Sequence, residues 1–410
     1  MGFYMLLAAH AQTFFNTADV VSAVENFPAS RGTVIGILKG FLGLSGAILI
    51  QIYRTFFNGK ASSFILMLAL LPSILSLLLM YFVQVYHDPN RSDDKRHLNS
   101  FSIISVITAA YLMLVIIGEN IFTMGLSGRI FSFTLLLILL ISPLTIVTRT
   151  QPSESSKILF DERKSLIEEE TLSKDQEIQV PSPKGESLNL LQSMKTLDFW
   201  LLFIAMSCGM GSGLATVNNM SQIGSSLGYS TMATSTLVSL WSIWNFLGRF
   251  GSGYISDYML HTRGWARPLF IALTLGTMSI GHLVISSALP GSLHIGSVLV
   301  GVCYGSQWAL MPSITSELFG LVHFGTIFNS IAIASPVGSY IFSVRVVGYI
   351  YDREASESGM CIGRSCFMLS FLIMASVTLG GSFISFALFL RTRRFYKEVV
   401  CAQIQASTAL

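Results

Sequence analysis

The chain of 410 residues is 52% hydrophobic and only 11% charged, with a mean hydropathy of +0.63. Soluble domains average about 25% charged residues, so this composition excludes an ordinary soluble enzyme and indicates residence in a lipid bilayer. The formal net charge of +3 is too small to indicate a nucleic-acid partner.

Apolar runs long enough to cross a bilayer, roughly 17 to 25 residues, predict an all-α polytopic membrane protein. The first run is the weakest, because His10, Gln12, Asn16 and Asp19 interrupt it. Eleven such segments follow one another along the chain: 2–24, 33–53, 62–83, 100–119, 128–147, 198–219, 233–254, 268–288, 293–313, 324–347 and 366–390.

Lysine and arginine are concentrated in alternate loops, which predicts the orientation, because cytoplasmic loops retain positive charge. The segment 148–197 and the tail 396–410 are therefore expected in the cytoplasm, and the N-terminus on the other side. Arg54 with Lys60 and Arg353 with Arg364 are exceptions to the pattern.

Composition changes abruptly at 148–197, which holds nine acidic and seven basic residues and three prolines. Such a segment is typical of a solvated linker. It divides the chain into a partial helix bundle with two extra helices (1–147), the linker, a six-helix bundle (198–395) and the tail. The linker is either a simple tether or a regulatory segment that carries phosphorylation sites at Ser153, Ser155 or Ser156.

Two short blocks in equivalent membrane contexts indicate an internal repeat. Glu25, Phe27 and Arg31 match Glu317, Phe319 and His323 at a constant offset of 292 residues, and a Gly-Thr pair follows each block. Two related bundles joined by a linker are typical of transporters, whose substrate site lies at the repeat interface. The repeat thus favours alternating access.

Glycines at spacings of four and three line one face of the second segment, from Gly32 to Gly46. Small residues allow close helix approach in lipid. The stripe serves either static packing or a helix that slides during a transport cycle. The Gly248-Arg-Phe-Gly-Ser-Gly253 sequence is not a dinucleotide fingerprint, because it ends a membrane span outside any βαβ unit.

Lys39 and Asp19 are ionisable residues predicted at membrane depth, where such groups are costly and are functional hypotheses by default. Each lies about ten residues from the turn near Pro28, on neighbouring antiparallel segments, so both are expected at similar depth. Three roles stay open: a structural ion pair, binding of an anionic substrate by Lys39 with proton transfer by Asp19, or snorkelling to the interface. Glu119, near a segment end, is either interfacial or a proton carrier.

Amides and aromatic residues in the second half are further substrate-site candidates, since groups of this kind can hydrogen-bond and stack on a small organic molecule. Interhelical hydrogen bonds would explain the same residues without a ligand. His282 is interpreted as a packing residue. The main candidates are Asn218, Asn219, Gln307, Trp308 and Asn329.

Cys361 and Cys366 lie in or beside a loop expected outside the cytosol. A disulfide, two free thiols and a metal site are the alternatives. The seven histidines show no zinc spacing. There is no P-loop, nucleophile-base order or catalytic carboxylate pair, so no cofactor, metal or enzymatic activity is predicted.

Several motifs resemble the plant nodulin-like branch of the major facilitator superfamily, which includes nuclear fusion defective four-like proteins. The matching motifs are Phe15-Asn-Thr-Ala18, Asn26-Phe-Pro28, Arg31-Gly32, Gly36-Ile-Leu-Lys-Gly40, Asp198-Phe-Trp200, Asn218-Asn219, Gly248-Arg249, Val347-Gly-Tyr-Ile-Tyr-Asp352 and Cys366-Phe367. A gating motif of Gly248, Arg249, Gly253-x-x-x-Asp257 and Arg263 is similar to the superfamily's loop motif, in which Asp and Arg gate the conformational switch. Arg263 lies further along than in that pattern.

The resemblance implies a two-bundle transporter fold of which this chain lacks the first three helices, because the Pro-x-x-Arg-Gly junction resembles the loop between helices four and five. It implies a secondary transporter of a small organic solute, anionic and monocarboxylate-like, coupled to protons, in the plasma membrane or an endomembrane. The alternative is a non-transporting receptor or scaffold, or an inactive shortened form.

Overall fold

The computed structural model describes residues 2–57, 60–79, 94–122, 125–143, 187–355 and 360–402, and the regular structure in these ranges is helical. Long apolar stretches with few internal breakers favour helix, in which every backbone group finds a partner inside the segment. The elements are α1 (Gly2–Asn26), α2 (Arg31–Phe56), α3 (Ala61–Leu79), α4 (Asp94–Ile121), α5 (Leu126–Ile141), α8 (Leu190–Met194), α9 (Leu197–Asn218), α10 (Met220–Ser226), α11 (Thr231–Arg263), α12 (Pro268–Ser287), α13 (Ser292–Phe319), α14 (Phe324–Ala332), α15 (Ala334–Ser339), η2 (Tyr340–Gly348), α16 (Tyr349–Glu354), α17 (Ser365–Phe395) and η3 (Tyr396–Val400).

Each of the eleven predicted segments overlaps a helix. Among the described residues, six helical stretches are long and apolar enough to cross a membrane: Arg31–Phe56, Arg96–Glu119, Leu197–Asn218, Pro268–Ser287, Phe324–Glu354 and Ser365–Val400. Helices α11 and α13 are also long, but polar residues such as Asn245, Arg249 and Gln307 interrupt their apolar character. The structure therefore establishes a multi-helix membrane protein without fixing the number of spans.

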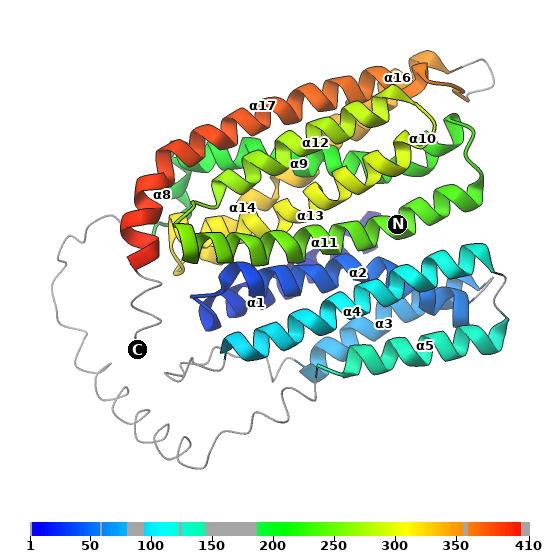
Figure 1. Cartoon of the computed structure of the whole chain (residues 1–410), viewed down its shortest axis with the longest axis horizontal. Helices are drawn as coiled ribbons and strands as arrows, with labels where there is room; N and C mark the ends of the chain where they lie inside the picture. The colour runs from blue at the N-terminus through cyan, green and yellow to red at the C-terminus, as the bar shows by residue number, and fades with distance from the viewer. Residues whose placement is uncertain are drawn as a thin grey trace, which may run out of the picture.

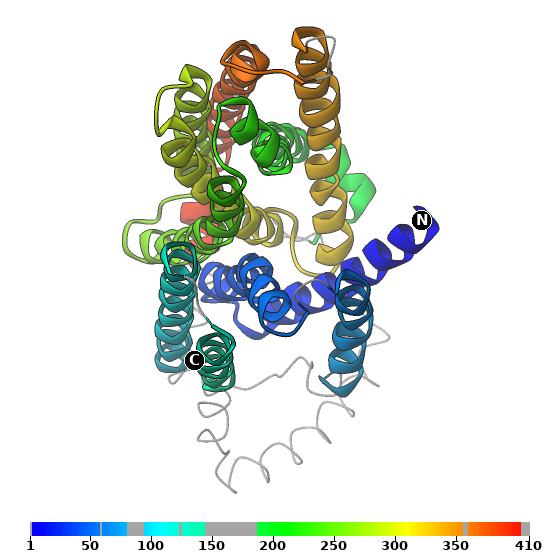
Figure 2. The same ribbon diagram turned by 90° about the vertical axis from the view of Figure 1, so that its right-hand side faces the viewer.

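The long helices run roughly side by side (Figure 1). Helices α9 to α17 form one bundle. Helices α1, α2 and α4 lie along one side of it, and α3 and α5 lie farther out, an arrangement seen from the end in Figure 2. The two parts are called the N-terminal half (2–143) and the C-terminal half (187–402). Their closest approach is between α2 and α11.

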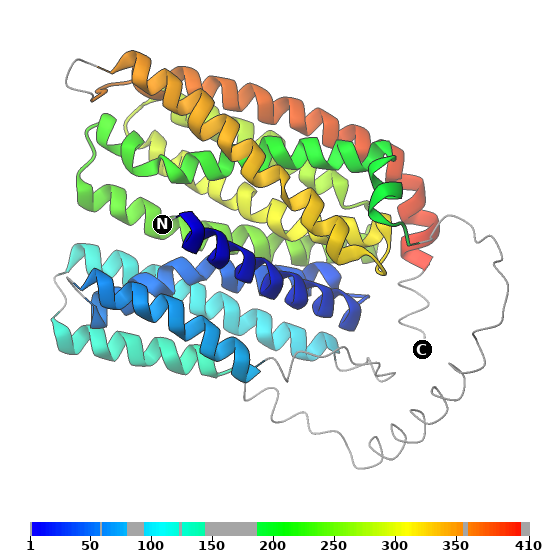
Figure 3. The same cartoon turned by 180° about the vertical axis from the view of Figure 1, so that it is seen from behind.

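The bundle has two distinct ends. A disulfide joins Cys361 to Cys366 at one of them, the disulfide end. The other, the basal end, carries the turn between α1 and α2, the α11–α12 loop and the α13–α14 connection, as the rear view illustrates (Figure 3). The two repeat blocks, Glu25–Arg31 and Glu317–His323, form two of these three connections, the α1–α2 turn and the α13–α14 connection.

Most of the predicted linker, with Ser153, Ser155 and Ser156, lies outside the described residues, as do the last eight residues of the tail. Ser187, where the described residues resume, lies against Gly320 after the end of α13. Asn189 and Gln192 form a reciprocal capping box that begins α8. The Leu188 N–H donates to the Phe319 carbonyl at 2.9 Å, which ties the start of this half to the end of α13.

Candidate functional site

Glycines hold α2 and α11 in close contact where the two halves meet. A Cβ placed on Gly253 would lie 2.2 Å from the Gly32 carbonyl oxygen, and one on Gly36 would lie 2.9 Å from the Arg249 carbonyl oxygen. Only backbones without side chains can approach this closely. The glycine stripe of the sequence is therefore the seam between the N-terminal and C-terminal halves.

Gly253→Ala is expected to lower the free energy of unfolding by about 1–3 kcal/mol, because the new methyl group overlaps the α2 backbone. Gly251→Ala is the matched control, since a Cβ there meets nothing within 4 Å. Thermal unfolding of the purified variants in detergent checks this. Equal midpoints for the two variants would contradict the close seam.

Asp257, at the basal end of α11, caps the first turn of α2. Its carboxylate accepts hydrogen bonds from the Gly32 N–H at 3.1 Å, and from the Thr33 N–H and hydroxyl at 2.6 Å each. The local N-cap residue, Ser30, makes no side-chain capping bond. The unpaired N–H groups and positive dipole of α2 are thus neutralised by a carboxylate from the other half.

Arg267 connects Asp257 to Glu317. Its Nη2 donates to Asp257 Oδ1 at 2.6 Å and its Nε to Glu317 Oε1 at 2.7 Å, and the side chain is 1% exposed. Burial alone would lower the pKa of Arg267, but the carboxylates of Glu317 and Asp257 outweigh that effect and raise it above its ordinary value. The basal cluster of Asp257, Arg267, Glu317 and Tyr396, closed on α2, fastens the two halves together.

Arg267, rather than Arg263, is the partner of Asp257. Arg263 ends α11 on the surface, and its guanidinium lies 5.4 Å from the ring centroid of Trp265. The helix continues to Arg263 and the chain then turns through Gly264, whose φ is +64°. That turn carries Arg267 back beneath the seam, a path that residue spacing alone does not reveal.

Lys39 lies on α2, nearer the middle of the bundle, and is 2% exposed. Its ammonium group donates to Asn16 Oδ1 on α1 and lies 5.3 Å from the ring centroid of Phe328 on α14. None of the ion pairs among the described residues includes Lys39 or Asp19. The ion pair considered from the sequence is therefore not formed: Asp19 lies on an exposed face of α1, and Asn16 is the partner of Lys39.

Arg249 is a second buried cation beside Lys39, and it lies apart from the basal cluster. Its Nη1 donates to the Lys39 carbonyl oxygen at 3.1 Å and its Nε to Asn245 Oδ1 at 2.6 Å. Its guanidinium lies 5.7 Å from the ring centroid of Trp308. The sequence grouped Arg249 with the gating motif, but the structure places it with Lys39.

Neutral side chains surround these two cations. Thr17 on α1 and Asn329 on α14 bond to each other, with the Asn329 amide donating to the Thr17 hydroxyl at 2.8 Å. The indole N–H of Trp308 is buried and has no hydrogen-bond partner in the part of the chain that the structure describes. We call Asn16, Lys39, Asn245, Arg249, Trp308, Phe328 and Asn329 the central site. It is built from α1, α2, α11, α13 and α14, and so from both halves.

Three other candidates lie away from the central cations. Asn218 and Asn219 end α9 at the disulfide end, where the Asn219 amide donates to the Ser343 hydroxyl at 3.1 Å. Gln307 faces the interior of the C-terminal half, with its Nε2 3.5 Å from the Met278 sulfur. His282 is buried there too, 3.2 Å from the Ser212 hydroxyl.

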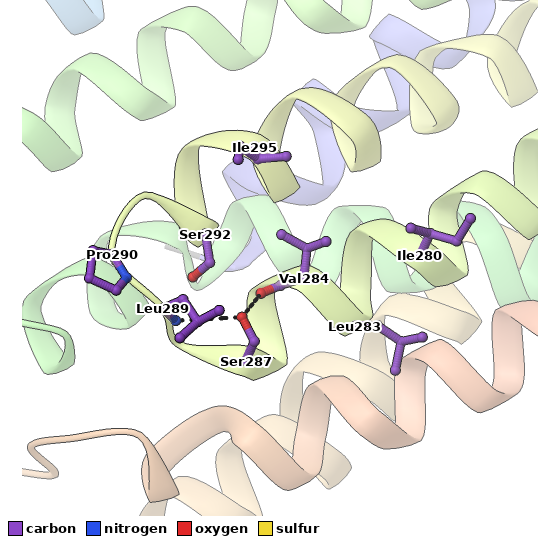
Figure 4. Close-up of a pocket in the computed structure, with 8 residues that line it drawn as sticks. All are labelled: Ile280, Leu283, Val284, Ser287, Leu289, Pro290, Ser292 and Ile295. Carbon is purple, nitrogen blue, oxygen red and sulfur yellow. Dashed lines mark hydrogen bonds between the residues drawn. The ribbon is translucent and has the colours of Figure 1, made fainter.

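A pocket of about 400 Å³ lies on the α12–α13 hairpin at the disulfide end (Figure 4). Apolar side chains such as Leu283, Leu289 and Ile295 line it, together with Ser287 and Ser292. No charged residue contributes to it. Its chemistry suits a lipid-facing surface, and the polar and charged groups converge at the central site instead.

Comparison with known proteins agrees with this division of the chain. Residues 1–148 match the family model "Nodulin-like", and residues 186–398 match the model "NFD4, C-terminal domain". The chain belongs to the NFD4 family of nodulin-like proteins. The second matched range is the C-terminal half described above.

Curated relatives of this NFD4-family chain include one protein named for a nuclear fusion defect and several named as probable transporters. Protein NUCLEAR FUSION DEFECTIVE 4 of Arabidopsis thaliana is 27% identical over 434 residues, which cover 96% of this chain and 72% of that protein. Probable transporter MCH1 is 24% identical in both Wickerhamomyces anomalus and Candida glabrata, over 47% and 44% of this chain and 39% of each relative. The chain thus aligns with well under half the length of these MCH1 proteins.

Sequence reasoning missed several residues of the two sites in this NFD4-family protein. Arg267 could have been found as an arginine directly before the proline that begins a span. Asn16 was noted as a polar interruption of an apolar run and as part of the Phe15-Asn-Thr-Ala18 motif, but not as a site residue. Tyr396 carries no local signal, because its contact with Glu317 joins positions 79 residues apart.

Proposed function

We propose that this chain is a secondary-active transporter of the major facilitator type that carries a small organic anion, monocarboxylate-like, by alternating access. The observation that carries the proposal is the pair of buried cations, Lys39 and Arg249, with no carboxylate within ion-pair distance among the described residues. Burying such charges is costly unless they are compensated. A carboxylate ligand would compensate them.

The position of the site supports alternating access. The central site draws side chains from both halves, and the basal cluster joins those halves by hydrogen bonds and ion pairs at the basal end. Separation at the basal cluster, with closure at the disulfide end, would expose the central site alternately to the two sides. We place the basal end in the cytoplasm, following the distribution of lysine and arginine. The name "probable transporter" borne by the MCH1 relatives agrees with transport.

Uptake by the full chain in proteoliposomes tests the proposal. The probes are radiolabelled acetate, lactate and pyruvate, and the matched neutral amide of each acid is the competitor. We expect saturable uptake of at least one of the acids. The other acids should inhibit this uptake, and the amides should not. Equal inhibition by the amides would contradict an anion site.

Asp19 is the proposed proton carrier, because it is the carboxylate on α1 closest in sequence to Asn16 of the central site and to Thr17, which bonds to Asn329. Asp19→Asn fixes this side chain in a neutral form. If protons drive uptake, the unmodified chain takes up more solute at acidic pH. We expect this increase to disappear in Asp19→Asn and to persist in Asp352→Asn, an exposed control on α16. An unchanged pH profile would remove Asp19 from the mechanism.

A further inference from the structure

The C-terminal turn, η3, reaches into the basal cluster. Tyr396 is fully buried, although it lies close to the end of the described chain. Its ring packs with Leu260 at the end of α11 and Ala266 in the α11–α12 loop, and Val400 completes this small apolar core. Its hydroxyl donates to Glu317 Oε2 at 2.8 Å. Because the Tyr396 ring is held in this apolar core, its hydroxyl is directed toward Glu317.

Glu317 is thereby fixed through both of its oxygens. Oε1 accepts from Arg267 and Oε2 accepts from Tyr396. With Nε held by Glu317, the guanidinium of Arg267 presents Nη1 to the Ser256 hydroxyl at 2.6 Å and Nη2 to Asp257 at 2.6 Å. The planar guanidinium has a fixed donor geometry, so holding one edge aims the other. The orientation of Asp257 toward α2 therefore depends on Glu317.

We propose that Tyr396 is a positioning residue for the basal gate: through Glu317 and Arg267 it aims Asp257 at the first turn of α2, so the C-terminal turn sets how firmly the two halves close. This inference rests on the gate in the proposed function and adds a residue outside the gating motif. Of the four side chains in the basal cluster, Tyr396 is the one contributed from the far end of the chain.

Tyr396→Phe removes the hydroxyl and keeps the ring, so the apolar core with Leu260 and Ala266 is retained. Opening can be followed with a reporter, Ile35→Cys on α2, since Ile35 is fully buried in the core that includes residues of both halves. The reporter is placed in the full chain with Cys208, Cys303 and Cys401 replaced by alanine and the Cys361–Cys366 disulfide retained. The readout is its rate of modification by a charged methanethiosulfonate in nanodiscs.

We expect Tyr396→Phe to increase the modification rate about tenfold, because a hydrogen bond to an ionised carboxylate is lost. Tyr258→Phe is the matched control, since Tyr258 is an exposed tyrosine near the same end of α11. In a Glu317→Gln background the effect of Tyr396→Phe should be much smaller, because the two changes break one connection. A loss of packing alone would give additive effects.

Asp257→Asn in the same assay separates this inference from the proposed gate. If Asp257→Asn accelerates modification and Tyr396→Phe leaves it unchanged or slows it, the gate stands and the role of Tyr396 is overturned. If neither variant changes the rate, the gate itself fails and the inference that rests on it fails too. The assay needs no solute, so both outcomes are independent of substrate identity.

Discussion

Lys39→Met is expected to reduce saturable uptake of monocarboxylates about a hundredfold while membrane abundance stays near that of the unmodified chain. Methionine preserves the length of the apolar stem but removes the ammonium group, which lies over the Phe328 ring and would pair with the solute. Truncating one partner of a buried charge pair costs about 2–5 kcal/mol, which is a large change in affinity. Uptake in proteoliposomes, normalised to protein amount, measures it.

Lys195→Met is the matched control, because Lys195 is an exposed lysine and loses the same charge. Arg249→Gln should reproduce the loss of uptake, since Arg249 is the second central cation. Loss of protein in proportion to loss of uptake would instead assign Lys39 a structural role in holding α1 through Asn16.

Arg267→Ala is expected to destabilise the protein by about 3–5 kcal/mol, whereas Arg263→Ala should change its stability by less than about 1 kcal/mol. The first change leaves Asp257 and Glu317 buried without their shared cation. The second removes only an exposed contact with Trp265. Thermal unfolding of the detergent-purified variants compares the two arginines directly.

Arg267→Lys refines the comparison. Lysine keeps the charge but cannot address two carboxylates with a planar fork, so an intermediate stability is expected. If Arg263→Ala is the more destabilising change, Arg263 would be the partner of Asp257, as the family motif suggested. That result would contradict the geometry of the α11–α12 loop.

Local composition was sufficient to predict the helices and one close-packing face. Apolar runs indicated the approximate position of each long helix, and the glycine spacing of α2 indicated close approach of another helix without identifying α11 as that helix. Lys39 could be singled out because a charge at membrane depth is costly wherever the neighbouring helices lie. These are properties of single segments, which sequence periodicity reports well.

Pairings between distant segments could not be predicted in the same way. Asp257 was recognised, but its partner depended on the path of the chain after Gly264, and Arg267 was not selected. Asp19 and Lys39 were correctly placed on neighbouring helices, yet the rotation of α1 turns Asn16 toward Lys39. Tyr396 joins the basal cluster only through the packing of α17. Side-chain direction, rather than helix position, was the missing information.

The most direct test of the account is whether the purified full chain binds a carboxylate at Lys39. Thermal unfolding is followed with acetate, lactate and pyruvate, each beside its neutral amide, for the unmodified chain and for Lys39→Met. We expect at least one acid to raise the unfolding midpoint in a concentration-dependent way, with no effect from its amide and none in Lys39→Met. Stabilisation by amides and acids alike, or by acids equally in both chains, would contradict an anion site between the two halves.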